Sequence, residues 1–243
     1  MSNSSAGLRR QTIKINQLSV ELKKEMFELF ATYYKDVEYE RFLSDLKEKT
    51  HSFLFFEKES NKLMGFSTIF RKEIPSIAPG KFLFSGDTVI HEKYRGSKGL
   101  QKSFFWFILI SKLKTPFHPL YWMLMSKGVK TYLLMRKNFK ASFPNLNHST
   151  PLKFQDVLDR FYQSKFPEDF LKEKGLITFK TKMGSVKSDK EVMAEGIRIN
   201  PDAQFFFNKN PHWENGEELA CVAEIRFRDF FYHIFKFFIP LLK

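Results

Sequence analysis

The order in which strand-like and helix-like segments follow one another constrains the fold of this chain more than any other feature of its sequence. Short apolar and aromatic runs bounded by turn residues predict strands, and apolar residues spaced three and four apart predict helices. They predict a strand at 11–19 followed by two helices at 20–35 and 39–49. Three strands at 51–57, 62–74 and 81–90 come next, and then a helix at 100–114, a strand at 120–126 and a helix at 130–138. A strand that leads through a helix into a neighbouring strand forms a parallel pair with a right-handed crossover. We therefore expect an α/β (α+β) fold with a mixed central sheet and a C-terminal extension.

The pattern is weaker in the C-terminal part of the chain. Helices are predicted at 151–164 and 167–174, and strands at 176–183, 198–207 and 218–225. We expect a flexible N-terminus at 1–10 and a core at 11–145. The region 146–225 then either belongs to the same domain or forms an appended subdomain, and 226–243 forms a basic amphipathic helix.

The positive charge of the chain is concentrated in one stretch. The formal net charge is +13, yet residues 93–155 contain no Asp or Glu and twelve Lys or Arg residues. A block of one sign is expected to bind an anion. The candidates are the phosphates of a coenzyme, an acidic carrier protein, an anionic lipid surface and nucleic acid. A solvated basic face without a partner is the alternative.

Several other classes of site are disfavoured by the composition. The lone Cys221 excludes a disulfide framework and a cysteine-based metal site. The six histidines show neither an i,i+4 pair nor HExxH spacing, so we predict no metal. The longest apolar run, 104–110, has seven residues, far short of the roughly 20 needed to cross a bilayer. Residues 1–10 lack the apolar region of a signal peptide, so we expect a cytoplasmic protein.

A basic loop with glycines lies between the predicted strand at 81–90 and the predicted helix at 100–114. The start of a helix presents unpaired N–H groups and the positive end of the helix dipole. Gly96 and Gly99 let the backbone approach a ligand without a Cβ in the way, and Arg95 and Lys98 add charge. This combination is typical of a phosphate-binding site.

The loop resembles a known family signature. Residues 89–101 look like the acyl-CoA-binding motif of the GNAT (Gcn5-related N-acetyltransferase) superfamily, Arg/Gln-x-x-Gly-x-Gly/Ala. The element order over 11–139 is similar to that superfamily, and 132–139 resembles its tyrosine-bearing helix. The chain departs from the motif because Gly99 fits only with one residue inserted, and because Gln101 replaces the last Gly or Ala.

The resemblance implies an N-acyltransferase that moves an acyl group from acyl-CoA or an acyl-carrier protein to an amine. The backbone of Val89 and Ile90 would pair with the pantetheine amides, extending the sheet. The pyrophosphate would be held by Arg95, Gly96, Ser97, Lys98, Gly99, Leu100 and Gln101.

Three residues are candidates for proton transfer. Asp87 is the best general base, provided that burial raises its pKa towards neutrality. His91 is an alternative base, because its ordinary pKa lies near working pH. Tyr132 would be the acid that protonates the leaving thiolate. Each has a structural alternative: a turn cap or lysine partner for Asp87, a surface or capping role for His91, and core packing for Tyr132.

The predicted C-terminal helix carries a stripe of large apolar residues, at Phe227, Phe230, Phe231, Ile234, Phe235 and Phe238. Basic residues outnumber acidic ones in this segment, so the helix can lie on an anionic membrane surface. The protein would then be peripheral at the inner face of the membrane and would suit a long-chain donor. Packing of the stripe on the protein's own sheet is the alternative.

Two further functions remain open on the sequence. The same fold can serve as a non-catalytic module that binds lipid or an acidic partner. Nucleic-acid binding is less favoured, because the aromatic residues of the basic block fall in apolar runs and not between the charges.

Overall fold

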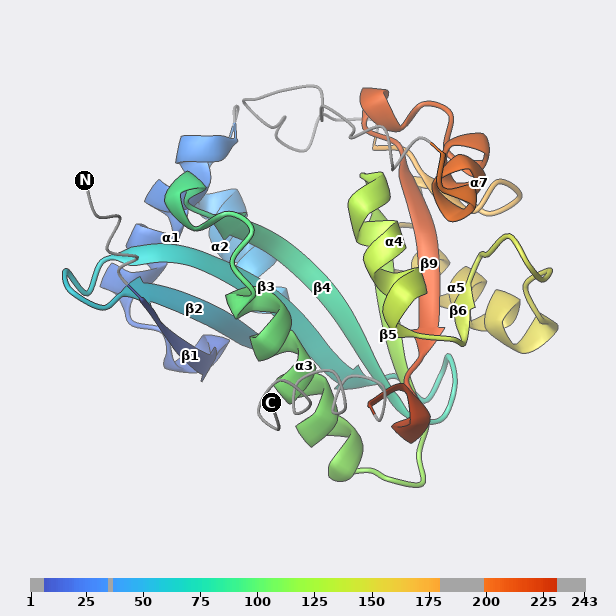
Figure 1. Cartoon of the computed structure of the whole chain (residues 1–243), viewed down its shortest axis with the longest axis horizontal. Coiled ribbons are helices and arrows are strands. Elements are labelled where there is room, and N and C mark those ends of the chain that lie inside the picture. The colour runs from blue at the N-terminus through green and yellow to red at the C-terminus, as the bar shows by residue number, and fades with distance from the viewer. Residues whose placement is uncertain (1–6, 35–36, 180–198, 231–243) are drawn as a thin grey trace, which may run out of the picture. The chain divides into compact units, whose positions relative to one another are not determined.

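The computed structural model describes residues 7–34, 37–179 and 199–230 of the chain (Figure 1). These residues divide into two compact units. The first holds the described residues within 7–72 and 84–111, and the second holds those within 73–83, 112–179 and 199–230.

The first unit is built on four neighbouring strands, in the order β1 (Leu8–Lys14), β2 (His51–Glu57), β3 (Leu63–Glu73) and β4 (Lys81–Ile90). β2 pairs antiparallel with both β1 and β3, so that Leu54 lies opposite Gln11 and Phe66. The interior of β2 is buried from Ser52 to Phe56. A strand with such a continuous apolar run requires cover on both faces of its sheet.

Helices supply that cover from both sides. The short 3-10 helix η1 (Ile15–Gln17) leads into α1 (Val20–Tyr33), which is followed by α2 (Tyr39–Glu48). Apolar residues of η1, α1 and α2 pack with Leu54 and Phe56 in one cluster. On the other face, α3 (Gly99–Leu113) places Phe107 5.4 Å from Phe53, measured between ring centroids. Because successive side chains of a strand point to opposite faces, Phe53 faces α3 whereas Leu54 faces the cluster of η1, α1 and α2.

The second unit is organised around β9 (Glu218–Glu224). This strand pairs antiparallel with β5 (Leu120–Ser126), β6 (Ser142–Phe143) and β8 (Leu176–Ile177). β8 pairs in turn with β7 (Phe170–Leu171). The start of β4 is the neighbour of β5 in the strand order.

The helices of the second unit include α4 (Val129–Asn138), α5 (Leu152–Lys165) and α7 (Pro201–Lys209). Two more 3-10 helices are η2 (Glu92–Tyr94) in the first unit and η3 (Trp213–Asn215) in the second. Aromatic contacts join the elements. Phe161 of α5 stacks on Phe82 with centroids 5.8 Å apart, and Tyr132 of α4 lies 5.5 Å from Phe206 of α7.

The structure confirms the predicted mixed α/β fold and the predicted order of elements from β1 to α4. The first strand begins at Leu8, three residues before the predicted start at residue 11. Two later predictions were wrong. The segment 167–174 contains β7 and no helix, and the described part of 198–207 contains α7 in place of a strand. Asn200 caps α7 by accepting a hydrogen bond from Ala203 N, and Pro201 occupies its first turn.

The predicted C-terminal helix falls largely outside the described residues. Residues 227–230 are helical, and 231–243 are not described. Within the described part of the chain, no helix is long and apolar enough to cross a membrane.

Candidate active site

The candidate site lies where β4 leaves the sheet. His91 donates its main-chain N–H to Met64 O at 2.8 Å, so the pairing with β3 continues one residue past the strand. Gly65 permits a close approach, because a Cβ there would lie 2.6 Å from Ile90 Cδ1 and 3.0 Å from Val89 O. Main-chain groups alternate in direction along a strand. Those of Val89 therefore face β3, and those of Ile90 face the opposite side of β4.

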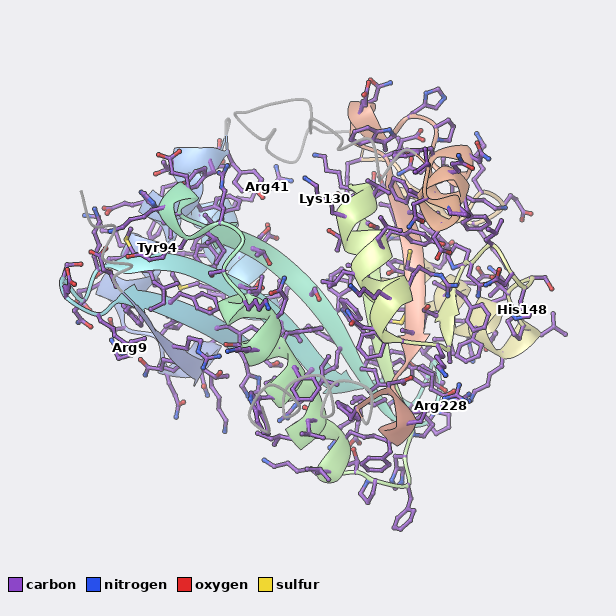
Figure 2. All side chains as sticks on the ribbon, in the orientation of Figure 1. Arg9, Arg41, Tyr94, Lys130, His148 and Arg228 are labelled. Atoms are coloured by element: carbon purple, nitrogen blue, oxygen red, sulfur yellow. The ribbon has the colours of Figure 1, made fainter. Side chains whose placement is uncertain are left out.

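A carboxylate at the end of β2 fixes the start of the loop. Glu57 accepts hydrogen bonds from Lys93 Nζ at 2.7 Å, from the Tyr94 hydroxyl (Figure 2) at 2.6 Å and from Ser60 Oγ at 2.6 Å. These donors lower the pKa of Glu57 to about 2, with the Lys93 hydrogen bond the largest cause. The short 3-10 helix η2 (Glu92–Tyr94) is held against the sheet in this way.

The last residue of α1 holds the loop from another side. The Tyr33 hydroxyl accepts a hydrogen bond from Glu92 N at 3.1 Å. The Arg95 guanidinium lies over the Tyr33 ring, 4.9 Å from its centroid, in a cation–π contact. Neither Arg95 nor Lys98 forms an ion pair with a described residue. Both positive charges therefore remain available to an anion.

Most main-chain N–H groups between the loop and the first turn of α3 are unpaired. Ser97 donates its N–H to Tyr94 O at 3.1 Å. No acceptor among the described residues receives the N–H of Gly96, Lys98, Gly99, Leu100 or Gln101. The regular hydrogen bonding of α3 begins with Lys102 N, which donates to Lys98 O at 3.0 Å. The predicted pyrophosphate loop thus presents a group of donors beside the positive end of a helix.

The turn at Gly96 depends on glycine. Its φ is +82°, a conformation that other residues rarely adopt. A Cβ at Gly96 would meet no atom within 4 Å. The requirement is therefore one of backbone conformation and not of space.

Asp87 lies on β4 in a half-buried position. Burial raises the pKa of its carboxyl, the charge of Lys49 lowers it, and the charge of Asp45 raises it further. Both neighbours come from the C-terminal end of α2 and the residue after it. The raised pKa is the property that a general base for an amine needs.

His91 makes a local contact that matches its structural alternative. Its Nδ1 accepts a hydrogen bond from Lys93 N at 3.3 Å, at the start of η2. A neutral ring that accepts at Nδ1 carries its proton on Nε2. In this geometry His91 caps the turn, and its role as a base stays a prediction.

Tyr132 belongs to the second unit, whereas Asp87 and His91 belong to the first. It is fully buried on α4, and its hydroxyl donates a hydrogen bond of 3.1 Å to Pro144 O. Burial raises the pKa of this hydroxyl far above its ordinary value. These contacts favour core packing over the acid role, which stays a prediction.

The sequence did not indicate Tyr33, Glu57 or Gly65 as parts of the site. Glu57 lies 36 residues before Lys93, and Tyr33 lies 59 residues before Glu92, so no local motif connects them. The one available signal was a carboxylate closing the otherwise apolar run of β2.

Comparisons with known proteins give similarity in structure alone. No family model and no curated protein matches the sequence. Similar solved structures include Escherichia coli ElaA, with a TM-score of 0.39 and 16% identity over 59% of this chain and 95% of that one. An acetyltransferase from Trypanosoma brucei has a TM-score of 0.42 and 13% identity, covering 58% and 99%. An IAA acetyltransferase from Bacillus cereus has a TM-score of 0.39 and 8% identity, covering 90% and 100%. The chain is thus similar to acetyltransferases of known structure, at TM-scores too low to carry a statement about its activity.

Proposed function

We propose that this chain is an N-acyltransferase that takes its acyl group from acyl-CoA. One observation carries the proposal: the N–H groups of Gly96 and of residues 98–101 have no acceptor among the described residues, and they lie beside two cations without an ion-pair partner. Unpaired donors at a helix start and free positive charge together form a site for a diphosphate.

The chemistry follows from a base on the strand that leads to this loop. Asp87 accepts a proton from the ammonium group of the acceptor, and the resulting amine attacks the thioester carbonyl carbon. The C–S bond then breaks as the C–N bond forms. The new amide nitrogen loses its extra proton, and the CoA thiolate leaves and takes up one proton. No described contact assigns the donor of that last proton, because the Tyr132 hydroxyl donates to Pro144 O.

The loop favours CoA over a carrier protein as the donor. CoA contains a diphosphate, whereas the prosthetic arm of a carrier protein contains a single phosphate. A group of unpaired amides beside Arg95 and Lys98 matches the larger anionic charge of the diphosphate.

Ligand-induced stabilisation tests the proposal directly. Acetyl-CoA at about 100 times its Kd should raise the free energy of unfolding by about 2.7 kcal/mol. Dephospho-CoA should stabilise to a similar extent because it keeps the diphosphate, and phosphopantetheine should stabilise much less. A thioester panel with a thiol-release readout and a set of amine acceptors then measures turnover. No stabilisation by any CoA compound would overturn the proposal.

The lipid-binding alternative rests on the predicted helix at 226–243. Of that segment, 231–243 lie outside the described residues, so membrane association stays a prediction from the sequence. Binding to anionic vesicles by the full chain, compared with a chain truncated after Ile225, tests it without reference to coenzyme.

A further inference from the structure

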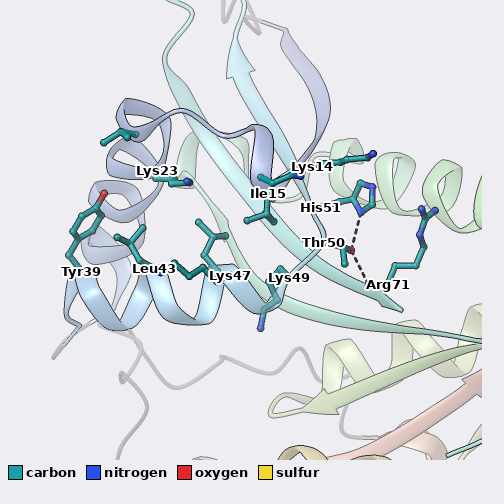
Figure 3. A pocket seen from close by; sticks show the side chains of 13 residues that line it. Lys14, Ile15, Lys23, Tyr39, Leu43, Lys47, Lys49, Thr50, His51 and Arg71 are labelled. Carbon is teal, nitrogen blue, oxygen red and sulfur yellow. Dashed lines mark hydrogen bonds between the residues drawn. The ribbon is translucent and has the colours of Figure 1, made fainter. Parts of the chain in front are cut away.

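A second site lies in the first unit, away from the loop at 91–101. It is a pocket of about 590 Å³ lined by residues of η1, the start of α1, α2, the start of β2 and the end of β3 (Figure 3). This volume falls within the range of pockets that hold small organic ligands, about 300 to 1,000 Å³.

The lining of the pocket is strongly one-sided in charge. None of its thirteen residues is Asp or Glu, and six are basic: Lys14, Lys23, Lys47, Lys49, His51 and Arg71. Lys14, Lys23 and Lys47 form no ion pair with a described residue. Like charges that line one pocket repel each other, so an anion placed among them stabilises the arrangement.

Part of the pocket wall is held in place by hydrogen bonds. The Thr50 hydroxyl accepts one from Arg71 N at 2.9 Å, donates to Ile69 O at 3.0 Å and contacts His51 Nδ1 at 2.9 Å (Figure 3). The Arg71 guanidinium donates to Ser111 Oγ at 3.2 Å. The His51 ring and the Arg71 guanidinium also lie against Phe107 of α3, at 5.0 and 5.3 Å from its ring centroid, so their polar groups are engaged there. The charge available to an anion therefore comes from Lys14, Lys23 and Lys47.

The remaining lining is largely apolar. Ile15 and Leu46 are buried, Tyr39 and Leu43 are half-buried, and Val20 is exposed at the rim. Inorganic phosphate would leave these side chains in contact with water. An anion that carries an apolar body would cover them as well as the charges.

We propose that this pocket binds an organic acid, a single carboxylate or phosphate monoester carrying a short apolar chain. The charge comes from the basic side chains and the apolar contact from the residues of η1, α1 and α2. The pocket shares no residue with the loop at 91–101. One lining residue, Lys49, also acts on Asp87, because its charge lowers the pKa of that carboxyl.

Isothermal titration of the full chain tests the pocket with octyl phosphate and octanoate. Octylamine, which has the same chain and the opposite charge, and inorganic phosphate, which lacks the chain, are the control ligands. Each titration is run alone and with saturating CoA, which occupies the loop at 96–101 under the proposed function. We expect both amphiphilic anions to bind in either condition, with the control ligands at least about tenfold weaker. The anion that binds more tightly identifies a carboxylate or a phosphate ester as the ligand.

A pair of matched variants locates the binding. Lys23→Gln combined with Lys47→Gln should weaken octyl phosphate by at least about tenfold. Lys24→Gln combined with Lys62→Gln removes the same charge outside the pocket and should leave binding unchanged, and circular dichroism checks the fold of both. Equal binding of octylamine, an equal loss in the control pair, or displacement of the anions by CoA would each overturn the proposal. Failure of CoA to bind would affect only the acyltransferase proposal.

Discussion

The Tyr94 hydroxyl donates a hydrogen bond of 2.6 Å to Glu57 Oε1 and thereby joins the end of β2 to the loop that leads into α3. Lys93 Nζ reaches the same oxygen at 2.7 Å. The loop is therefore shaped by a carboxylate distant in the sequence as well as by its own glycines. Presentation of the unpaired amides of 98–101 depends on this contact, because it fixes the chain just before they begin.

The stability that Glu57 contributes should depend on pH in a defined window, and Glu57→Gln should remove this dependence. The pKa of Glu57 is lowered from 4.5 to about 2 in the folded chain. Its contribution is therefore complete above pH 4.5 and is lost as pH falls towards 2. The Tm of Glu57→Gln should lie below that of the unmodified chain at pH 7, and the difference should shrink through this window. Glu59→Gln, an exposed neighbour, is the control, and an equal loss of Tm in that variant would contradict the prediction.

Reversing the charge of Lys98 should weaken coenzyme binding without weakening the fold. Lys98 is exposed and lacks an ion-pair partner among the described residues. A glutamate there would repel the diphosphate, and we expect the KM for acetyl-CoA to rise roughly tenfold, with a smaller effect at high salt. Lys62→Glu makes the same change on an exposed turn outside the loop. A rise in KM that is equal in both variants would show only a general charge effect.

The sequence predicted the strands before α4 well because their signals are local. The bounds of β2, β4 and β5 were predicted as observed, since Gly, Pro and Asn residues mark the turns around them. α7 was missed because the apolar run 205–207 resembles a strand. The capping residue Asn200 and the proline after it were stronger evidence for a helix.

The site shows the same division between local and distant signals. Gly96 and the basic residues of the loop form a motif that can be read in sequence order. Tyr33, Glu57 and the pocket around Lys23 could not be found in that way. Their partners come from other strands and helices, and the pairing register that brings them together follows from the whole sheet.

Tyr132→Phe should separate packing from proton transfer. The Tyr132 hydroxyl is buried and donates a hydrogen bond to Pro144 O, so its removal leaves that carbonyl without this donor. We expect the free energy of unfolding to fall by about 1 kcal/mol. Turnover should change by less than about threefold, against the hundredfold or more expected for loss of a general acid. A loss of kcat of that larger size at unchanged stability would instead support the acid role.

Asp87→Asn should stabilise the fold and abolish most of the activity. Burial raises the pKa of Asp87 above its ordinary 3.8, so the folded chain disfavours the ionised carboxylate. Ionisation therefore costs stability as pH rises through the interval between 3.8 and the raised pKa, and that cost persists at neutral pH. Asparagine removes the charge at nearly the same volume. The Tm of Asp87→Asn should exceed that of the unmodified chain at pH 7, and the two should converge below pH 3.8.

The activity of Asp87→Asn should fall, although its stability rises. Loss of a general base lowers kcat by about a hundredfold or more, while coenzyme binding at the loop should persist. Asp45→Asn is the control variant, because its expected effect on the pH profile would not occur if Asp87 had a purely structural role. The charge of Asp45 raises the pKa of Asp87, so its removal should move the acidic limb of the kcat/KM profile to lower pH and leave the maximum rate intact. An unmoved limb together with full turnover in Asp87→Asn would exclude Asp87 as the base, because a carboxylate that accepts the proton must impose its own pKa on the rate.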